Sequence, residues 1–248
     1  LALAQRVRKT GVVVGDGFGF VANRMIFEYQ RQSEFLVEEG ATPQEVDRVL
    51  KAFGMPMGPF EMFDMAGLDV GWRIRRDRAG LRPADRRYSV LNDLVCEAGW
   101  YGQKTRRGWF DYDARGRTPR PNHGLPPLVE KSRKAAGITP RPIDDAEILD
   151  RCLLALVNGG AKILAEGKAY RASDIDVIYL SGFGFPRWRG GPMHWADRRG
   201  LAQVLARIES FAALPHNGGW WQPSPLLVEL VRTGRSLADH DRASGKVP

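Results

Sequence analysis

Two polar residues in the first half of the chain, Asn23 and Lys104, are placed where they could take part in chemistry. Asn23 stands at the start of a long segment with helical periodicity. Its amide, which has two donors and an acceptor, can hold a substrate oxygen or cap a local turn. Lys104 lies in the glycine-bounded loop 102–108, where a lysine can face a phosphate group or remain solvated. On the residues alone we favour the structural role for Asn23 and the solvated role for Lys104.

The segment 17–22 reads GFGFVA and matches the G-x-G-x-x-A fingerprint of dinucleotide-binding turns. That fingerprint requires a second parallel strand after the helix that it opens, whereas the next segment carries the helix-capping signal TPQE at 42–45. We therefore interpret 17–22 as a junction between a short strand at 11–14 and a helix, where glycines relieve crowding.

These candidates belong to a sequence that repeats itself. In each copy a helical segment is followed by Glu-Gly, an aspartate, a Gly-x-Pro turn, Gly-Pro, a second aspartate and Gly-Leu. These landmarks fall at Glu39, Asp47, Gly54, Gly58, Asp64 and Gly67 in the first copy and at Glu166, Asp176, Gly184, Gly191, Asp197 and Gly200 in the second. The separation between partners drifts only from 127 to 133 residues, which indicates two tandem copies of one helical unit.

The repeat also bears on His194, which precedes Asp197 by three residues and could form a proton relay with it on a helix. The matching position in the first copy is Glu61, and a catalytic group would not be exchanged so freely. We therefore expect His194 to have a packing or surface role. The counterpart of Asn23 is Asp150, so whatever Asn23 does is not shared by both copies.

Periodicity and turn residues predict a mainly α fold. Helices are expected at 21–38, from the capping box at 42–45, from Pro59 to Gly67, at 84–98, from Asp144, after a Ser173 cap, and finally from Pro225. The proline-rich segment 115–142 is expected to be a linker with at most one helical turn at 129–135. We predict four parts: a connecting tail and strand at 1–16, the first helical domain at 17–114, the linker at 115–142 and the second helical domain at 143–248.

Composition narrows the possible functions. The chain has 248 residues, 43% of them hydrophobic and 27% charged, and a net charge of +8. Its basic residues are densest at 73–120, where acidic residues interrupt them, so we expect a solvated surface or attraction for an anionic small molecule rather than nucleic-acid binding. No apolar run is long enough for a membrane span, and the isolated Cys96 and Cys152 suggest neither a disulfide framework nor a metal site. A cytoplasmic location is expected.

Three long motifs then resemble a known family. They are GDGFGFVANRM at 15–25, EEGATPQEVDRVLKAFGMPMGPFEMFDMAGLD at 38–69 and GQKTRRGWFDYD at 102–113. They are similar to the C-terminal helical part of L-3-hydroxyacyl-CoA dehydrogenases. The second copy, with FPRWRGGPM at 185–193, resembles the tandem version in multifunctional enoyl-CoA hydratase/3-hydroxyacyl-CoA dehydrogenases of fatty acid β-oxidation, of the peroxisomal type and its bacterial relatives. The resemblance covers about residues 9–236 and departs at Phe18, where relatives usually have proline.

The resemblance implies an NAD-dependent oxidation of 3-hydroxyacyl-CoA to 3-ketoacyl-CoA. It implies that Asn23 reaches the active site and that Lys104 reaches NAD. The catalytic His-Glu pair and most of the NAD site belong to an N-terminal Rossmann domain of the parent chain, which this sequence lacks, so we expect an inactive fragment of a longer enzyme. It also implies that the two copies pack as an intramolecular pseudo-dimer. The alternative is a helical dimerisation or scaffold module without a direct catalytic role.

Overall fold

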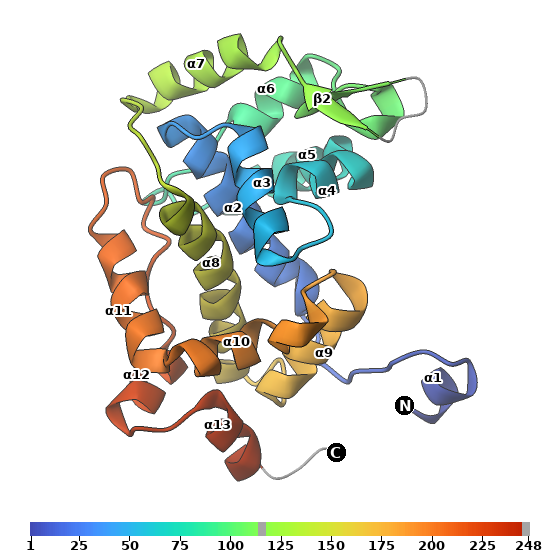
Figure 1. Cartoon of the computed structure of the whole chain (residues 1–248), viewed down its shortest axis with the longest axis vertical. Helices are drawn as coiled ribbons and strands as arrows, with labels where there is room; N and C mark the ends of the chain where they lie inside the picture. Colours follow the sequence, from blue (N-terminus) through green and yellow to red (C-terminus); the bar gives the residue numbers. More distant parts are fainter. Residues whose placement is uncertain (114–117, 245–248) are drawn as a thin grey trace.

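The computed structural model describes residues 1–113 and 118–244, and helices dominate the described part of the chain (Figure 1). The predicted boundary between 114 and 115 lies outside the described residues. The elements of the first half are α1 (Ala2–Arg6), α2 (Ala22–Glu39), α3 (Pro43–Phe53), α4 (Pro59–Ala66), α5 (Leu68–Asp77), α6 (Leu91–Glu97), β1 (Phe110–Tyr112), β2 (Pro119–Pro121) and α7 (Leu125–Ala136), with short 3-10 turns at Ala79–Leu81 and Gln103–Thr105.

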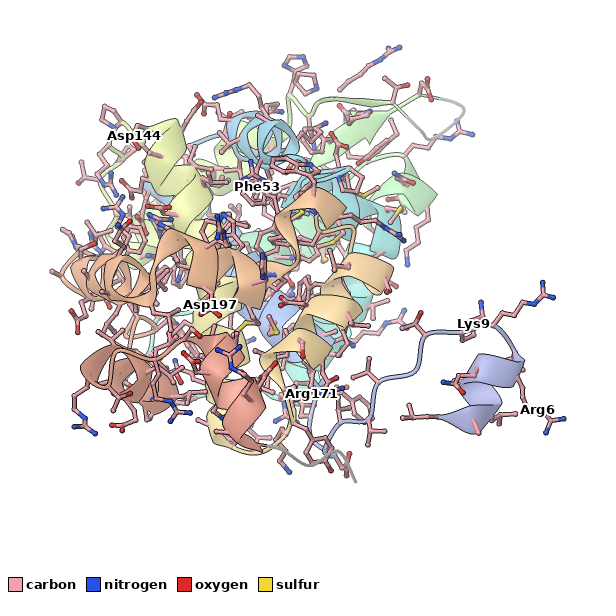
Figure 2. All side chains as sticks on the ribbon, turned by 60° about the horizontal axis from the view of Figure 1, so that its bottom comes forward. Arg6, Lys9, Phe53, Asp144, Arg171 and Asp197 are labelled. Carbon is pink, nitrogen blue, oxygen red and sulfur yellow. The ribbon has the colours of Figure 1, made fainter. Side chains whose placement is uncertain are left out.

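The second half repeats the order of long helix, shorter helix and short proline-opened helix. Its elements are α8 (Asp145–Ala165), α9 (Ala172–Gly182), a 3-10 turn at Arg187–Arg189, α10 (Pro192–Arg199), α11 (Leu201–Ala212), α12 (Pro225–Arg232) and α13 (Leu237–Ser244). Within the described ranges 1–113 and 118–244, no helix combines the length and apolar character that a membrane crossing requires. At the N-terminal end of the chain, α1 lies apart from the packed helices and is joined to them by an extended segment, as the positions of Arg6 and Lys9 show (Figure 2).

The predicted capping box at the start of α3 is confirmed. The Thr42 hydroxyl accepts a hydrogen bond from the Glu45 backbone N–H at 3.2 Å, and the Glu45 carboxylate accepts one from the Thr42 N–H at 2.8 Å. Pro43 occupies the first helical position, where its missing N–H costs nothing. Gly54 ends the helix with a positive φ of 118°, so the local sequence fixes both ends of α3.

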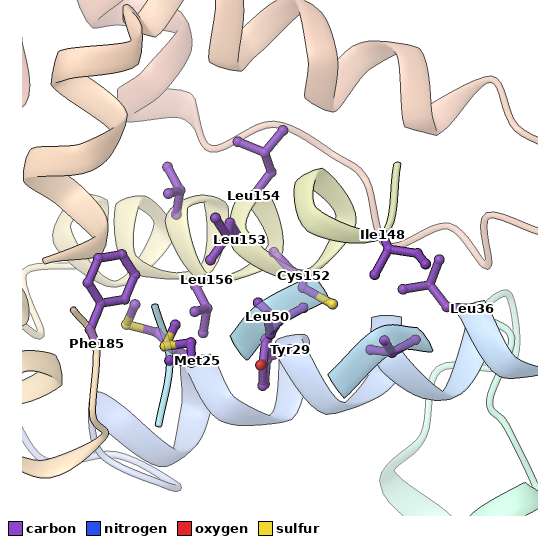
Figure 3. Packing of buried hydrophobic residues seen from close by; sticks show 14 of the residues in the cluster. Met25, Tyr29, Leu36, Leu50, Ile148, Cys152, Leu153, Leu154, Leu156 and Phe185 are labelled. Atoms are coloured by element: carbon purple, nitrogen blue, oxygen red, sulfur yellow. The ribbon is translucent and has the colours of Figure 1, made fainter. Parts of the chain in front are cut away.

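The two long helices, α2 and α8, pack antiparallel at the centre of a single core that both halves share (Figure 3). Met25 and Tyr29 on α2 and Cys152 and Leu156 on α8 are all buried there. The small residue Gly160 permits the close approach, because a Cβ at this position would lie 3.2 Å from Met25 Cε. The Ser33 hydroxyl faces the Cys152 thiol at 3.7 Å on the same interface.

Contacts between the two halves occur in reciprocal pairs. Arg24 on α2 bonds Glu166 after α8 at 2.5 Å, and Arg151 on α8 bonds Glu39 on α2 at 2.6 Å. Each residue of the first pair has its counterpart in the second pair 127 positions away. Likewise, the contact of Gly160 with Met25 corresponds to that of Ser33 with Cys152 at the same offset. Reciprocal contacts of this kind are the property of a two-fold related interface.

Several expected elements differ from the structure. The stretch 11–14 is not a strand and has only an isolated bridge from Val14 to Ala169. The helix expected at 84–98 is shortened to Leu91–Glu97, and an additional helix, α5, precedes it. Ser173 does not cap α9, because the Asp241 carboxylate accepts from the Ala172 N–H at 2.6 Å and the Ser173 N–H at 3.0 Å instead. Pro225 opens α12 as expected, but α13 follows it.

The segment expected to be a linker is also ordered over much of its length. β2 pairs antiparallel with β1, and α7 packs on α2 and α6 with Leu125 and Val129 buried. Prolines do not prevent this helix because they lie in its first turn, where the backbone N–H groups have no partner within the helix. Arg133 on α7 donates to the carbonyls of Val37 and Glu38 at the end of α2, at 3.0 and 2.9 Å. The segment is therefore part of the packing of the first half.

Candidate active site

The side chain of Asn23 is exposed in the first turn of α2. Within residues 1–113 and 118–244 its amide has no hydrogen-bond partner, and no side chain caps the helix at this end. The structural role that we favoured from the residues alone, a local cap, is therefore not the one that the structure shows. The amide is free to bind a group from outside the described chain.

The junction before Asn23 directs the chain into α2. Gly19 and Phe20 both have positive φ values, of 75° and 48°, which turn the backbone just before the helix begins. Phe18 stacks on Phe27 with ring centroids 5.7 Å apart, and the Arg78 guanidinium lies 3.8 Å above the Phe18 ring. Packing of aromatic rings, rather than a second parallel strand, thus holds the GFGFVA segment.

Lys104 lies in a loop that is stabilised by hydrogen bonds, and it forms an ion pair with Asp69. Its ammonium group donates to the carboxylate of Asp69 in the first turn of α5, and this hydrogen bond lowers the pKa of Asp69. The Thr105 hydroxyl accepts from the Tyr101 N–H at 2.8 Å and donates to the Arg107 carbonyl at 2.9 Å. About half of the Lys104 side chain remains exposed. The ammonium is therefore held in place but still accessible to an anionic ligand.

The resemblance implies that Lys104 reaches NAD. On that expectation, replacing Lys104 with alanine should raise the apparent KM for NAD about 10-fold and leave kcat nearly unchanged, because a positioned cation contributes to cofactor binding more than to hydride transfer. Steady-state kinetics of the full-length protein at varied NAD concentration measure this effect. Lys131→Ala, at an exposed position on α7, serves as the control. A fall in kcat with an unchanged KM for NAD would contradict the assignment.

The roles of the repeated aspartates could not be predicted from the sequence. In the structure, their carboxylates accept hydrogen bonds that hold neighbouring elements together. The Asp64 carboxylate accepts hydrogen bonds from the Trp109 and Phe110 N–H groups, each at 3.0 Å, and from the Tyr112 hydroxyl at 2.9 Å. Burial raises the pKa of Asp64 to about 7. Asp64 therefore ties α4 to the end of the Lys104 loop.

The other repeated aspartates accept hydrogen bonds from backbone N–H groups at the start of other helices. Asp47 accepts from the first N–H groups of α4, and Asp176 from those of α10. Asp197 accepts hydrogen bonds from the Leu237 and Ala238 N–H groups, at 2.8 and 2.9 Å, and so caps the start of α13. Their shared position in both copies was the only sequence signal of this role.

The remaining candidates are His194, which lies at the surface, and Asp150, which forms ion pairs. His194 is exposed, and the carboxylate of Asp197 is engaged by α13, so the two do not form a proton relay. Asp150, the counterpart of Asn23, is buried and pairs with Arg199 and with Arg207, the latter at 2.9 Å. No hydrogen bond or ion pair joins Asn23 to Lys104 in the described part of the chain. Across the described ranges, no cluster of His, Cys, Asp and Glu side chains is suited to a metal ion.

Comparisons of the chain with family models and with known proteins agree on one family. The model of the 3-hydroxyacyl-CoA dehydrogenase C-terminal domain matches residues 19–112 and again 148–243. The chain is 47% identical over 247 residues to the peroxisomal bifunctional enzyme of Danio rerio, covering 94% of this chain and 34% of that protein. It is 34% identical over 242 residues to the glyoxysomal fatty acid beta-oxidation multifunctional protein MFP-a of Cucumis sativus, covering 96% and 33%. The chain thus spans about a third of the length of these curated relatives.

A solved structure agrees with this result. The dehydrogenase part of multifunctional enzyme 1 from C. elegans superposes with a TM-score of 0.69 at 27% identity, covering 92% of this chain and 51% of that one.

The expectation of a cytoplasmic location is wrong, because the curated relatives at 32–47% identity are named as peroxisomal or glyoxysomal proteins. The expectation of a mainly α fold with two tandem copies is confirmed. From the two matched segments, the repeated landmarks and the shared helical core, the chain belongs to the family of the 3-hydroxyacyl-CoA dehydrogenase C-terminal domain, of which it carries two copies.

Proposed function

We propose that this chain is the substrate- and NAD-closing part of an L-3-hydroxyacyl-CoA dehydrogenase that oxidises 3-hydroxyacyl-CoA to 3-ketoacyl-CoA in fatty acid β-oxidation. The observation that carries the proposal is the free amide of Asn23, which stands where the resemblance of the GDGFGFVANRM motif implies an active-site asparagine. The names of the relatives support β-oxidation as the process and a peroxisomal or glyoxysomal compartment as the location.

The residues of this chain would then divide the work with an N-terminal Rossmann domain of the same parent protein. Asn23 orients the oxygen of the 3-hydroxyl group as it becomes a carbonyl, through the two donors of its amide. Lys104, held by Asp69, offers a positive charge to NAD, which accepts the hydride in this class of reaction. The described residues hold no parallel sheet, so the His-Glu base and most of the NAD site belong to the Rossmann domain in this proposal.

The two copies would form the intramolecular equivalent of a dimer, with domains at 17–114 and 143–248. The reciprocal contacts of α2 and α8 support this arrangement. Fusion of the copies makes their contact independent of protein concentration. The second copy can then lose its active-site residues and keep its packing residues, as the ion-paired Asp150 illustrates.

The alternative, a purely helical scaffold, makes a different prediction for the whole protein. Under our proposal the full-length protein reduces NAD with a 3-hydroxyacyl-CoA, and the isolated chain 1–248 does not, because the proposal places the base and the hydride-accepting fold in the Rossmann domain. Following NADH absorbance for both proteins tests this. NAD reduction by the pure chain would contradict the division of roles, and an inactive full-length protein would favour the scaffold.

A further inference from the structure

A cavity of about 350 Å³ opens beside α2 in the first copy. Its walls come from α2, from α5 and from the segment 78–89, and the second copy closes it with the ring of Trp220. The indole N–H of Trp220 donates to the Arg87 carbonyl at 2.8 Å, which fixes the ring at this place. The second copy therefore builds part of a cavity that belongs to the first.

The cavity continues the face of α2 that carries Asn23. Phe27, Gln30 and Glu34 line it, and they follow Asn23 at intervals of four, seven and eleven residues. These intervals place all four side chains on one side of the helix. From Asn23 to Glu34 the helix rises about 16 Å, which an extended hydrocarbon chain spans with roughly 13 bonds.

The charged groups of the cavity are already engaged, which argues against an anionic ligand. Four arginines line it, and each one is paired or stacked: Arg31 lies 3.3 Å over the Trp220 ring, Arg75 bonds Asp93 at 2.7 Å, Arg78 covers Phe18, and Arg82 lies 5.0 Å over the Tyr88 ring. At the far end, the Glu34 carboxylate accepts from Gln30 at 2.8 Å and from Asn92 at 3.1 Å. What remains for a ligand is the apolar surface of aromatic rings, Ile74, Leu81 and arginine stems.

The matching face of α8 in the second copy is filled. The counterparts of Phe27, Gln30, Arg31 and Glu34 are Leu154, Val157, Asn158 and Ala161, and all four are buried. Asn158 is bonded to the backbone of the segment that leads to α12, through the Gln222 carbonyl at 2.9 Å and the Ser224 N–H at 2.8 Å. The same fold thus closes this face in one copy and leaves it open in the copy that carries Asn23.

We propose that this cavity receives the distal part of the substrate's acyl chain, with Trp220 of the second copy as one wall of the channel. The inference rests on the proposed dehydrogenase function and adds a role for the second copy, which would set chain-length preference without touching the reacting atoms. Substrates with chains too short to pass Phe27 would not use the cavity.

Gly71→Leu tests the proposal, because Gly71 lines the cavity from α5. A Cβ there meets only the Arg75 guanidinium, at 3.3 Å, which need shift by only a few tenths of an ångström. Leucine is also a better helix former than glycine, so the fold should tolerate the change. In the full-length protein we expect kcat/KM for a long-chain 3-hydroxyacyl-CoA to fall about 10-fold or more, while that for a short-chain substrate changes less than about twofold. Val70→Leu, on the exposed side of the same helix, is the matched control.

Equal losses for long and short substrates, or no loss for either, would overturn the proposal and leave the dehydrogenase function intact. A second measurement does not depend on turnover. Binding of a long-chain acyl-CoA to the full-length protein, followed by isothermal titration calorimetry, should weaken about 10-fold in Gly71→Leu and not in Val70→Leu. If the protein shows this binding pattern but reduces no NAD, the proposed function fails and the cavity assignment stands. Equal binding by all three proteins overturns the assignment.

Discussion

Replacing Arg151 with alanine is expected to lower the free energy of unfolding by about 3 kcal/mol, near the lower end of the range for breaking a buried ion pair. Arg151 is only 1% exposed, and its guanidinium donates to Glu39 at 2.6 Å and to Gln32 at 3.1 Å. Its removal leaves the buried Glu39 carboxylate short of a partner in the core between the two copies. Arg87, at 3.2 Å from Glu39, compensates in part, and this is why we expect the lower end of the range.

The duplicated fold supplies the control for this prediction. Arg24 pairs with Glu166 at the position that corresponds to Arg151 and Glu39, but the two side chains are 35% and 45% exposed. Arg24→Ala is therefore expected to cost about 1 kcal/mol or less, because water already screens this pair. Urea denaturation of the chain measures both variants. Equal losses from Arg151→Ala and Arg24→Ala would show that burial does not distinguish the two pairs.

Under the proposed function, Asn23→Ala is expected to lower kcat of the full-length protein about 10²–10³-fold, the usual loss when one oriented donor to a developing oxyanion-like group is removed. Because the amide is exposed and has no partner in the described part of the chain, the substitution should leave stability nearly unchanged. Thermal unfolding of the variant checks that second expectation. A loss of stability together with the loss of activity would indicate a structural asparagine.

Asp150→Ala is the matched control for Asn23→Ala. Asp150 occupies the corresponding position in the second copy, where it pairs with Arg199 and Arg207 rather than facing a site. Its loss should therefore reduce stability and leave turnover nearly unchanged.

The parts of the fold that could be predicted from the sequence are those encoded by local signals. The capping box at Thr42 and Glu45 defines the start of α3, and Pro59 and Gly67 bound α4 as expected. The missed elements depend on contacts distant in sequence. α7 is ordered because Leu125 and Val129 pack on α2 and α6, and α9 begins at a cap provided by Asp241 from the end of the chain. The periodicity within α7 or α9 does not indicate partners that lie far away in the sequence.

In the candidate site, too, contacts between residues distant in sequence could not be predicted. Asn23 and Lys104 were assigned through resemblance to a family, since the residues alone favoured a cap and a solvated lysine. The ion pair of Lys104 with Asp69 joins positions 35 residues apart, and Trp220 reaches the cavity from the other copy. Both depend on how α5 and the loop before α12 pack in three dimensions, so spacing along the chain could not reveal them.

In the proposed enzyme, the first copy carries the catalytic contact and the second copy carries its packing equivalent. The most direct measurement is the rate of NADH formation in a single turnover, with the full-length protein saturated with NAD and a 3-hydroxyacyl-CoA, for the native protein, Asn23→Ala and Asp150→Ala. We expect a rate about 10²–10³-fold lower for Asn23→Ala and a native rate for Asp150→Ala. Equal losses in the two variants, or a native rate in Asn23→Ala, would contradict the proposed division of roles between the copies.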